Sequence, residues 1–168
     1  LYGVDAVHGN NNIYGTTVFP HNIALGAAND EQLMTQIGEV VAEEVRAAGV
    51  QWTFAPTLGN AQNERWGRTY ECFNEDAGEV AKLGAAYIRG LQGEKGTENY
   101  LDENHVLACA KHYIGEGYTE DGVNQGNVDM TAEEFDALMD SGLLDPYTAA
   151  LDEGVLTVMI SYNSVDGV

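Results

Sequence analysis

Residues 105–113 read HVLACAKHY, and this stretch decides the class of fold. The apolar or small residues at 106–110 predict a β-strand that is buried on both faces, as in a parallel sheet. Lys111 and His112 then follow side by side, before a loop rich in glycine and acidic residues. Buried lysine is rare unless it is paired, so the end of this strand carries either a structural ion pair or a functional site.

Helical patterns alternate with strands on both sides of this stretch. Residues 18–27 predict a loop or a short helical turn. Apolar residues at helical spacing predict a helix over 30–48, which Asn29 or Asp30 can cap and which ends at Gly49 in the left-handed position. Asn74 is the expected cap of a second helix, which runs to about residue 91.

A third helical region begins with a capping box formed by Thr131 and Glu134. We expect it to break near Pro146 and to end at Gly154, because proline and glycine interrupt helices. Further strands are predicted at the sequences YGVD, VQWTFAP and VLTVMISYNS.

Alternating strands and helices with near-continuous apolar strands predict parallel strands covered by helices. An open doubly wound sheet and a (β/α)8 barrel both fit this alternation. No glycine-rich nucleotide-binding motif follows any strand, and the polar residues cluster after the strand ends, where a barrel builds its site. We therefore predict an α/β fold, in which residues 1–168 form an incomplete TIM-type barrel domain of about four βα units.

The charge of the chain narrows its range of partners. It has 27 acidic and 7 basic residues among 168, a formal net charge of −20. A surface this negative repels nucleic acids and anionic lipids, so neither is an expected partner. No apolar run approaches the roughly 18–20 residues that a membrane span needs. Of the two cysteines, Cys109 lies in a predicted strand and is expected to be a buried thiol, whereas Cys72 follows a polar loop.

Each predicted strand ends in its own set of polar residues. Acidic, guanidinium, ammonium and imidazole groups that meet at one edge of a barrel suit a neutral, polyhydroxylated ligand, because charged groups bind vicinal hydroxyls strongly. Aromatic residues beside them can stack on a sugar ring. These residues are Asp5 and His8; Arg65, Arg68 and Glu71; Lys111, His112, Glu116, Asp121 and Asn124; and Ser161, Tyr162 and Asn163.

Other interpretations of these residues stay open at this point. The Lys111–His112 pair also fits a structural ion pair. A lysine at a barrel strand end fits a Schiff-base aldolase as well, in which the amine attacks a carbonyl. The four histidines show no metal-ligand spacing and the acidic loop at 120–134 fails the calcium-loop pattern, so no metal is expected.

Several motifs resemble one family when they are taken together and in order. YGVDAVHG, FPHNIALGA, FAPT, RWGRTYE, ACAKHYIGEG, DGVNQGN and VMISYNS are similar to the N-terminal barrel domain of glycoside hydrolase family 3, most of all to its β-glucosidase and exo-β-glucanase branch. The resemblance covers essentially the whole chain. It implies a retaining hydrolase that releases glucose from the non-reducing end of β-glucosides or β-glucans, without a cofactor. A non-catalytic carbohydrate-binding barrel is the alternative.

The resemblance also assigns sugar-binding roles to particular residues. It implies that one sugar, in the −1 subsite, is bound by residues from four strand ends: Asp5, Arg68, Lys111, His112, Met159 and Tyr162. Val123 stands where the N-acetylglucosaminidase branch has a catalytic histidine, which favours the glucosidase branch.

The catalytic carboxylates of the family have no counterpart among these residues. The family's nucleophile stands in an SDW-like motif that does not occur here, and its acid/base is carried by a second domain. We therefore expect both catalytic carboxylates to lie beyond Val168. Accordingly, we expect no activity of this segment alone and a requirement for the rest of its own chain.

Two further expectations follow. Neighbouring side chains of a regular strand point to opposite faces, so Lys111 and His112 can both bind one sugar only if the backbone leaves the regular pleat between them. The family resemblance implies an extracellular or periplasmic location. Linkage preference, aglycone preference and oligomeric state do not follow from these residues.

Overall fold

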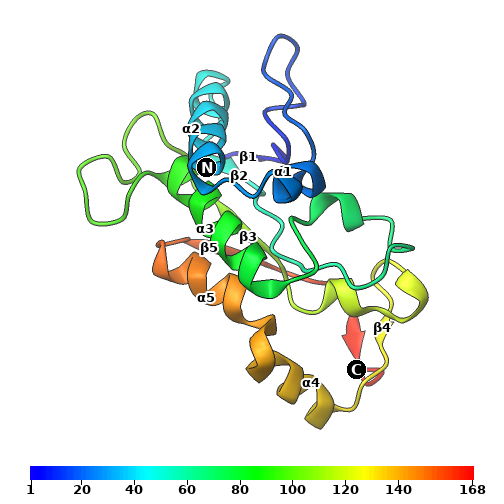
Figure 1. The fold of residues 1–168 in the computed structure, drawn as a ribbon. Coiled ribbons are helices and arrows are strands. Elements are labelled where there is room, and N and C mark those ends of the chain that lie inside the picture. Colours follow the sequence, from blue (N-terminus) through cyan, green and yellow to red (C-terminus); the bar gives the residue numbers. More distant parts are fainter.

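The computed structural model describes residues 1–168 and is organised around a row of four parallel strands (Figure 1). β1 pairs with β2 and β3 pairs with β5, while parallel bridges Trp52–Leu107 and Thr57–Lys111 join the β2 segment to β3. Strands that follow one another in the sequence are therefore neighbours in space. In a doubly wound sheet the order reverses beside the first strand. The predicted arc of an α/β barrel is confirmed. The strands of the row are β1 (Gly3–Val4), β2 (Trp52–Thr53), β3 (Cys109–Tyr113) and β5 (Thr157–Ile160).

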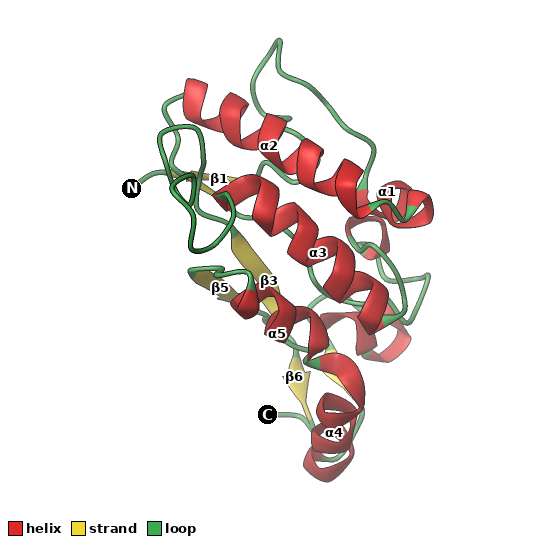
Figure 2. Cartoon of the chain, turned by 60° about the vertical axis from the view of Figure 1, so that its left-hand side comes forward, coloured by secondary structure: helices red, strands yellow, loops and turns green.

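Three helices, α2, α3 and α5, lie side by side over one face of this row (Figure 2). Val41, Val80, Ile88 and Ala108 are fully buried in the core between helices and strands. No helix combines the length and apolarity of a membrane span. The α-helices are α1 (Asn22–Ala28), α2 (Glu31–Ala47), α3 (Ala77–Gln92), α4 (Ala132–Leu138) and α5 (Asp145–Asp152); shorter helical turns are η1 (Thr69–Glu71), η2 (Glu116–Tyr118), η3 (Glu120–Gly122) and η4 (Met139–Leu143).

Glycines allow α2 and α3 to approach closely. A Cβ atom on Gly90 would lie 2.1 Å from the carbonyl oxygen of Thr35, and one on Gly38 would lie 2.6 Å from that of Tyr87. Both distances are far below van der Waals contact, so the helix spacing requires the absence of a side chain at these two positions.

The first long helix begins and ends as predicted. The side chain of Asp30 accepts a hydrogen bond from the Leu33 N–H, and Gly49 follows the helix with φ of 79°. The prediction of Asn74 as the cap of the next helix was wrong. Asp76 is the N-cap, and its Oδ1 accepts from the Glu79 N–H, whereas Asn74 accepts from the Asp76 N–H in the turn before.

The third helical region opens on the predicted capping box between Thr131 and Glu134. It breaks near Pro146, as predicted, but the proline is not the cause. The interruption lies in η4, where Gly142 adopts φ of 131°, a conformation that favours glycine. Pro146 stands instead in the first turn of α5, where a missing N–H leaves no helical hydrogen bond unmade.

The regular strands are shorter than predicted. In the segment VQWTFAP, for example, only Trp52–Thr53 has strand geometry. An additional parallel pair was not predicted: β4 (Asn127–Val128) pairs with β6 (Ser164–Val165). Figure 1 shows this pair near α4 and the C-terminal end.

Candidate functional site

Side chains from successive strand ends meet in one pocket of about 340 Å³. Asp5 follows β1, Arg68 lies in the connection after β2, and Lys111 belongs to β3. This is the carboxyl edge of the strands, where barrel enzymes place their sites. The pocket is lined by Asp5, Val7, His8, Asn11, His21, Arg68, Tyr70, Glu71 and Lys111.

Lys111 and Asp5 form an ion pair in the wall of the pocket. Nζ of Lys111 donates to Oδ1 of Asp5 over 3.0 Å. The lysine side chain is only 3% exposed, whereas that of Asp5 is 62% exposed. A buried ammonium group therefore has its counterion at the rim, and much of the Asp5 carboxylate stays accessible to a ligand.

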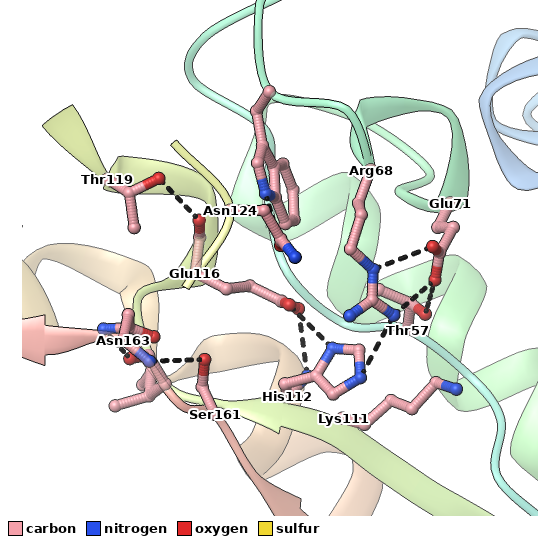
Figure 3. A network of polar contacts seen from close by, with 12 residues as sticks. Thr57, Arg68, Glu71, Lys111, His112, Glu116, Thr119, Asn124, Ser161 and Asn163 are labelled. Atoms are coloured by element: carbon pink, nitrogen blue, oxygen red, sulfur yellow. Dashed lines mark hydrogen bonds and ion pairs between the residues drawn. The ribbon is translucent and has the colours of Figure 1, made fainter. Parts of the chain in front are cut away.

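Arg68 and Glu71 form a two-pronged ion pair beside it (Figure 3). Nε and Nη2 of Arg68 donate to the two carboxylate oxygens of Glu71, each over 2.8 Å. Burial opposes ionisation of Glu71, but the hydrogen bonds and charge of Arg68 outweigh burial and lower its pKa. The same hydrogen bonds raise the pKa of Arg68, so both groups are charged at neutral pH.

His112 joins this pair from β3. Its Nε2 lies 3.2 Å from Nη2 of Arg68, so Arg68 connects Glu71 to the histidine. Lys111 and His112 thus both contact residues that line the pocket. The strand register shifts between Lys111 and Tyr113, and the Lys111–His112 peptide bond is cis. The prediction that the backbone leaves the regular pleat here is confirmed.

Three further residues that were predicted at strand ends, Met159, Tyr162 and Arg65, do not line the pocket. Met159 pairs with Lys111 across β3 and β5 and is partly buried. Tyr162 follows β5, is 83% exposed and does not line the pocket. Arg65, in the same loop as Arg68, is exposed. Cys109 is a buried free thiol, as expected, and burial raises its pKa.

Val168, beyond which the catalytic carboxylates are expected, lies away from the pocket. Its side chain is exposed and it is not among the lining residues. Its backbone N–H donates to the Val165 carbonyl over 3.0 Å, in a turn that follows β6. The expectation of carboxylates beyond Val168 is not tested by the residues described and stays a prediction.

An aromatic wall of the pocket was only partly predicted. The rings of His8 and His21 stack with centroids 4.1 Å apart, and Tyr70 meets His21 edge-on at 4.7 Å. Nδ1 of His8 bonds the Phe19 carbonyl over 3.0 Å, which anchors the stack. His8 was among the predicted strand-end residues, but no role was predicted for His21 or Tyr70. His21 stands in the motif FPHN and Tyr70 in the motif RTYE, so the family motifs were the only sequence feature that could have indicated a role for these two residues.

A second hollow, of about 390 Å³, lies between α1 and residues 61–75. Its lining contains no basic side chain. The charged pocket around Lys111 is therefore the better candidate for a specific polar ligand.

The fold and the pocket together define an α/β-barrel segment with a polar ligand site at the carboxyl edge of its strands. Residues 1–168 match the glycosyl hydrolase family 3 N-terminal domain over their whole length, and the chain belongs to this family. The chain is 32% identical to a lysosomal β-glucosidase of Dictyostelium discoideum over 100% of the chain and 20% of that protein. It is 37% identical to a β-xylosidase of Formosa agariphila, over 92% of the chain and 21% of that protein. A periplasmic β-glucosidase of Salmonella typhimurium is 30% identical over 99% of the chain and 20% of its own length.

Solved structures of this family superpose closely on the chain. An exo-1,3/1,4-β-glucanase from a Pseudoalteromonas species has a TM-score of 0.92 at 41% identity, over 99% of the chain and 20% of the enzyme. A mutant β-glucosidase from Listeria innocua, in complex with laminaribiose, has a TM-score of 0.86 at 34% identity, over 100% of the chain and 22% of that protein. The chain thus spans about a fifth of the length of its relatives.

Proposed function

We propose that this chain provides the −1 sugar subsite of a retaining β-glucosidase or exo-β-glucanase. The observation that carries the proposal is the convergence of Asp5, Arg68 and Lys111, from three successive strand ends, on one pocket, with His112 in contact with Arg68. The positive charges of the ammonium and guanidinium groups are paired there with the negative charges of carboxylates, which suits a neutral ligand rich in hydroxyl groups. The glucanase and glucosidase names among the similar structures support the same substrate class.

The carboxylates that line the pocket fit binding better than attack. Asp5 is ion-paired with Lys111, and both oxygens of Glu71 accept from Arg68. A retaining mechanism needs a free nucleophilic carboxylate about 5–5.5 Å from an acid/base. We infer that both catalytic carboxylates lie beyond Val168 and that this segment needs the rest of its own chain for turnover.

Steady-state kinetics of the full-length protein test this proposal. We expect hydrolysis of an aryl β-glucoside with the β-anomer of glucose as the first product, seen by NMR. Lys111→Ala should lower kcat/KM by about 100-fold or more, because sugar contacts strengthen in the transition state. Residues 1–168 alone should show no turnover. Turnover by this segment that Asp5→Ala abolishes would instead make Asp5 a nucleophile.

A β-xylosidase is the second candidate, because a relative with that name is 37% identical. An aryl β-xyloside, which lacks the hydroxymethyl group of glucose, separates the two in the same assay. Binding of laminaribiose without hydrolysis of either substrate would favour a non-catalytic carbohydrate-binding barrel.

A Schiff-base aldolase is less well supported, because the attacking amine must be neutral, whereas the Lys111 amine forms an ion pair with Asp5. Borohydride trapping with a carbonyl substrate would label Lys111 if that mechanism operated.

We further propose a location outside the cytoplasm, in the periplasm or the extracellular medium. The periplasmic relative in Salmonella typhimurium supports this, although the Dictyostelium discoideum relative is named as lysosomal. Cell fractionation with an antibody against the protein tests it, and enrichment in the cytoplasm would contradict it.

A further inference from the structure

His112 occupies an unusual place in the sheet. Lys111 pairs with Met159 and Tyr113 pairs with Ile160, but His112 has no partner on β5 because the register shifts there. Its two backbone polar groups are satisfied by side chains instead. The His112 N–H donates to Oε1 of Glu116 over 3.0 Å, and its carbonyl accepts from the hydroxyl of Tyr147 over 2.9 Å.

The carboxylate of Glu116 also reaches the His112 ring (Figure 3). Its Oε2 lies 2.6 Å from Nδ1, which is buried and has no other polar partner. The contact is close, but it does not form a well-aligned hydrogen bond. One buried side chain, 5% exposed, therefore contacts both the backbone and the ring of His112.

The opposite side of the ring determines where its proton lies. Arg68 can only donate, so Nε2 of His112 must accept from Nη2, and the ring proton belongs on Nδ1. A carboxylate can only accept, and Glu116 is the group at Nδ1. The two neighbours thus require the same tautomer, which leaves Nε2 as an acceptor on the side of the ring that faces Arg68.

The surroundings of Glu116 are shaped to hold it. A Cβ on Gly59 would lie 2.6 Å from its Oε1, so glycine leaves the space that the carboxylate occupies. Burial, with the charge of Glu116 nearby, raises the pKa of Tyr147, so the tyrosine hydroxyl stays protonated and donates to the His112 carbonyl.

We propose that Glu116 is a positioning residue that fixes the backbone, the ring orientation and the tautomer of His112, with Tyr147 supporting the same residue from the other side. The inference rests on the proposed function, in which His112 contacts the sugar. Glu116 itself acts only through His112 and is not assigned contact with the substrate.

The variant Glu116→Gln in the full-length protein is the sharpest test. Glutamine has the size of glutamate, but one of its two terminal atoms is a donor NH2 group, so it cannot present an acceptor at both positions, one at the His112 backbone N–H and one at Nδ1. We expect kcat/KM for an aryl β-glucoside, and affinity for isofagomine measured by calorimetry, to fall by about 10- to 100-fold. Glu120→Gln is the matched control: Glu120 is exposed in the same loop, and its variant should stay within about twofold of wild type.

A double-mutant cycle separates positioning from a general structural effect. In a His112→Ala background, the factor by which Glu116→Gln lowers kcat/KM should be at least five times smaller than in wild type, because the ring that Glu116 orients is absent. An equal loss in both backgrounds, or a loss below twofold in wild type, would overturn the proposal. If Glu116→Gln does not fold, Tyr147→Phe decides: it should lower kcat/KM by about 3- to 10-fold, and no loss would overturn the proposal.

A crystal structure of Glu116→Gln tests the positioning role of Glu116 independently of the proposed function. If the wild type neither binds nor hydrolyses any glycoside, the proposed function fails. A rotated His112 ring, or an Arg68 side chain withdrawn from Nε2, would still support the positioning role. An unchanged His112–Arg68 contact would refute it.

Discussion

Replacing Arg68 by lysine keeps the positive charge at the site but removes its planar fork. In the structure the guanidinium makes three contacts: one to each carboxylate oxygen of Glu71, and one to Nε2 of His112. A single ammonium group cannot reproduce this geometry, so lysine is not a conservative replacement here. We expect it to retain one contact with Glu71 and to lose the other two.

The expected size of the effect follows from these two losses. Each hydrogen bond to a charged group contributes about 1.5 kcal/mol at the lower end of measured values. The lost contact with Glu71 weakens the fold whether or not ligand is bound, so it appears mainly as a lower thermal midpoint. The lost contact with His112 disturbs the pocket itself, and about 1.5 kcal/mol corresponds to a roughly tenfold decrease in kcat/KM.

The assay compares Arg68→Lys with Arg65→Lys in the full-length protein, by steady-state kinetics on an aryl β-glucoside and by thermal unfolding. Arg65 lies in the same loop and is exposed, so its variant should match wild type in both measurements. If Arg68→Lys keeps kcat/KM within twofold of wild type, or if Arg65→Lys loses as much, the Glu71–Arg68–His112 arrangement does not shape the pocket.

Three further predictions concern stability. Because the pKa of Glu71 is lowered in the folded state, its charge stabilises the fold above about pH 4.3, the unfolded value. Glu71→Gln should therefore be less stable than wild type at pH 7, by thermal unfolding, and the difference should shrink below pH 4; a gap that widens in acid would contradict this. Gly90→Ala should destabilise the fold by about 1–2 kcal/mol, since overpacking against Thr35 costs about 2–3 kcal/mol and helix propensity returns roughly 1 kcal/mol. Gly78→Ala in the same helix, whose Cβ would meet only the Asp76 side chain, should change stability by less than about 1 kcal/mol. Finally, with a net charge of −20, raising NaCl from 10 mM to 1 M (roughly a tenfold shorter Debye length) should raise the thermal midpoint, and a falling midpoint would refute self-repulsion as a destabilising term.

Much of the local structure was predictable because its signals lie close together in the sequence. Apolar spacing located α2, and the Asp30 cap, Gly49 and the Thr131–Glu134 capping box act within one or two turns of a helix. Predictions failed where two neighbouring residues can both fill the same structural role, such as the cap of a helix. Asn74 and Asp76 are both good caps, and only the path of the chain decides that Asp76 accepts the helix N–H while Asn74 closes the preceding turn.

For the site, the sequence by itself determined which residue types stand at the strand ends, including Asp5, Arg68, Lys111 and His112. Only the tertiary structure decided how they combine. It joined Arg68 to both Glu71 and His112, placed Tyr162 outside the pocket, and brought Tyr147 to the His112 carbonyl. The physical reason is distance along the chain: Lys111 and Asp5 are 106 residues apart, and no local pattern reports which buried donor meets which acceptor. That pairing is determined when parallel strands and their loops pack together, because each buried polar group must then find its partner.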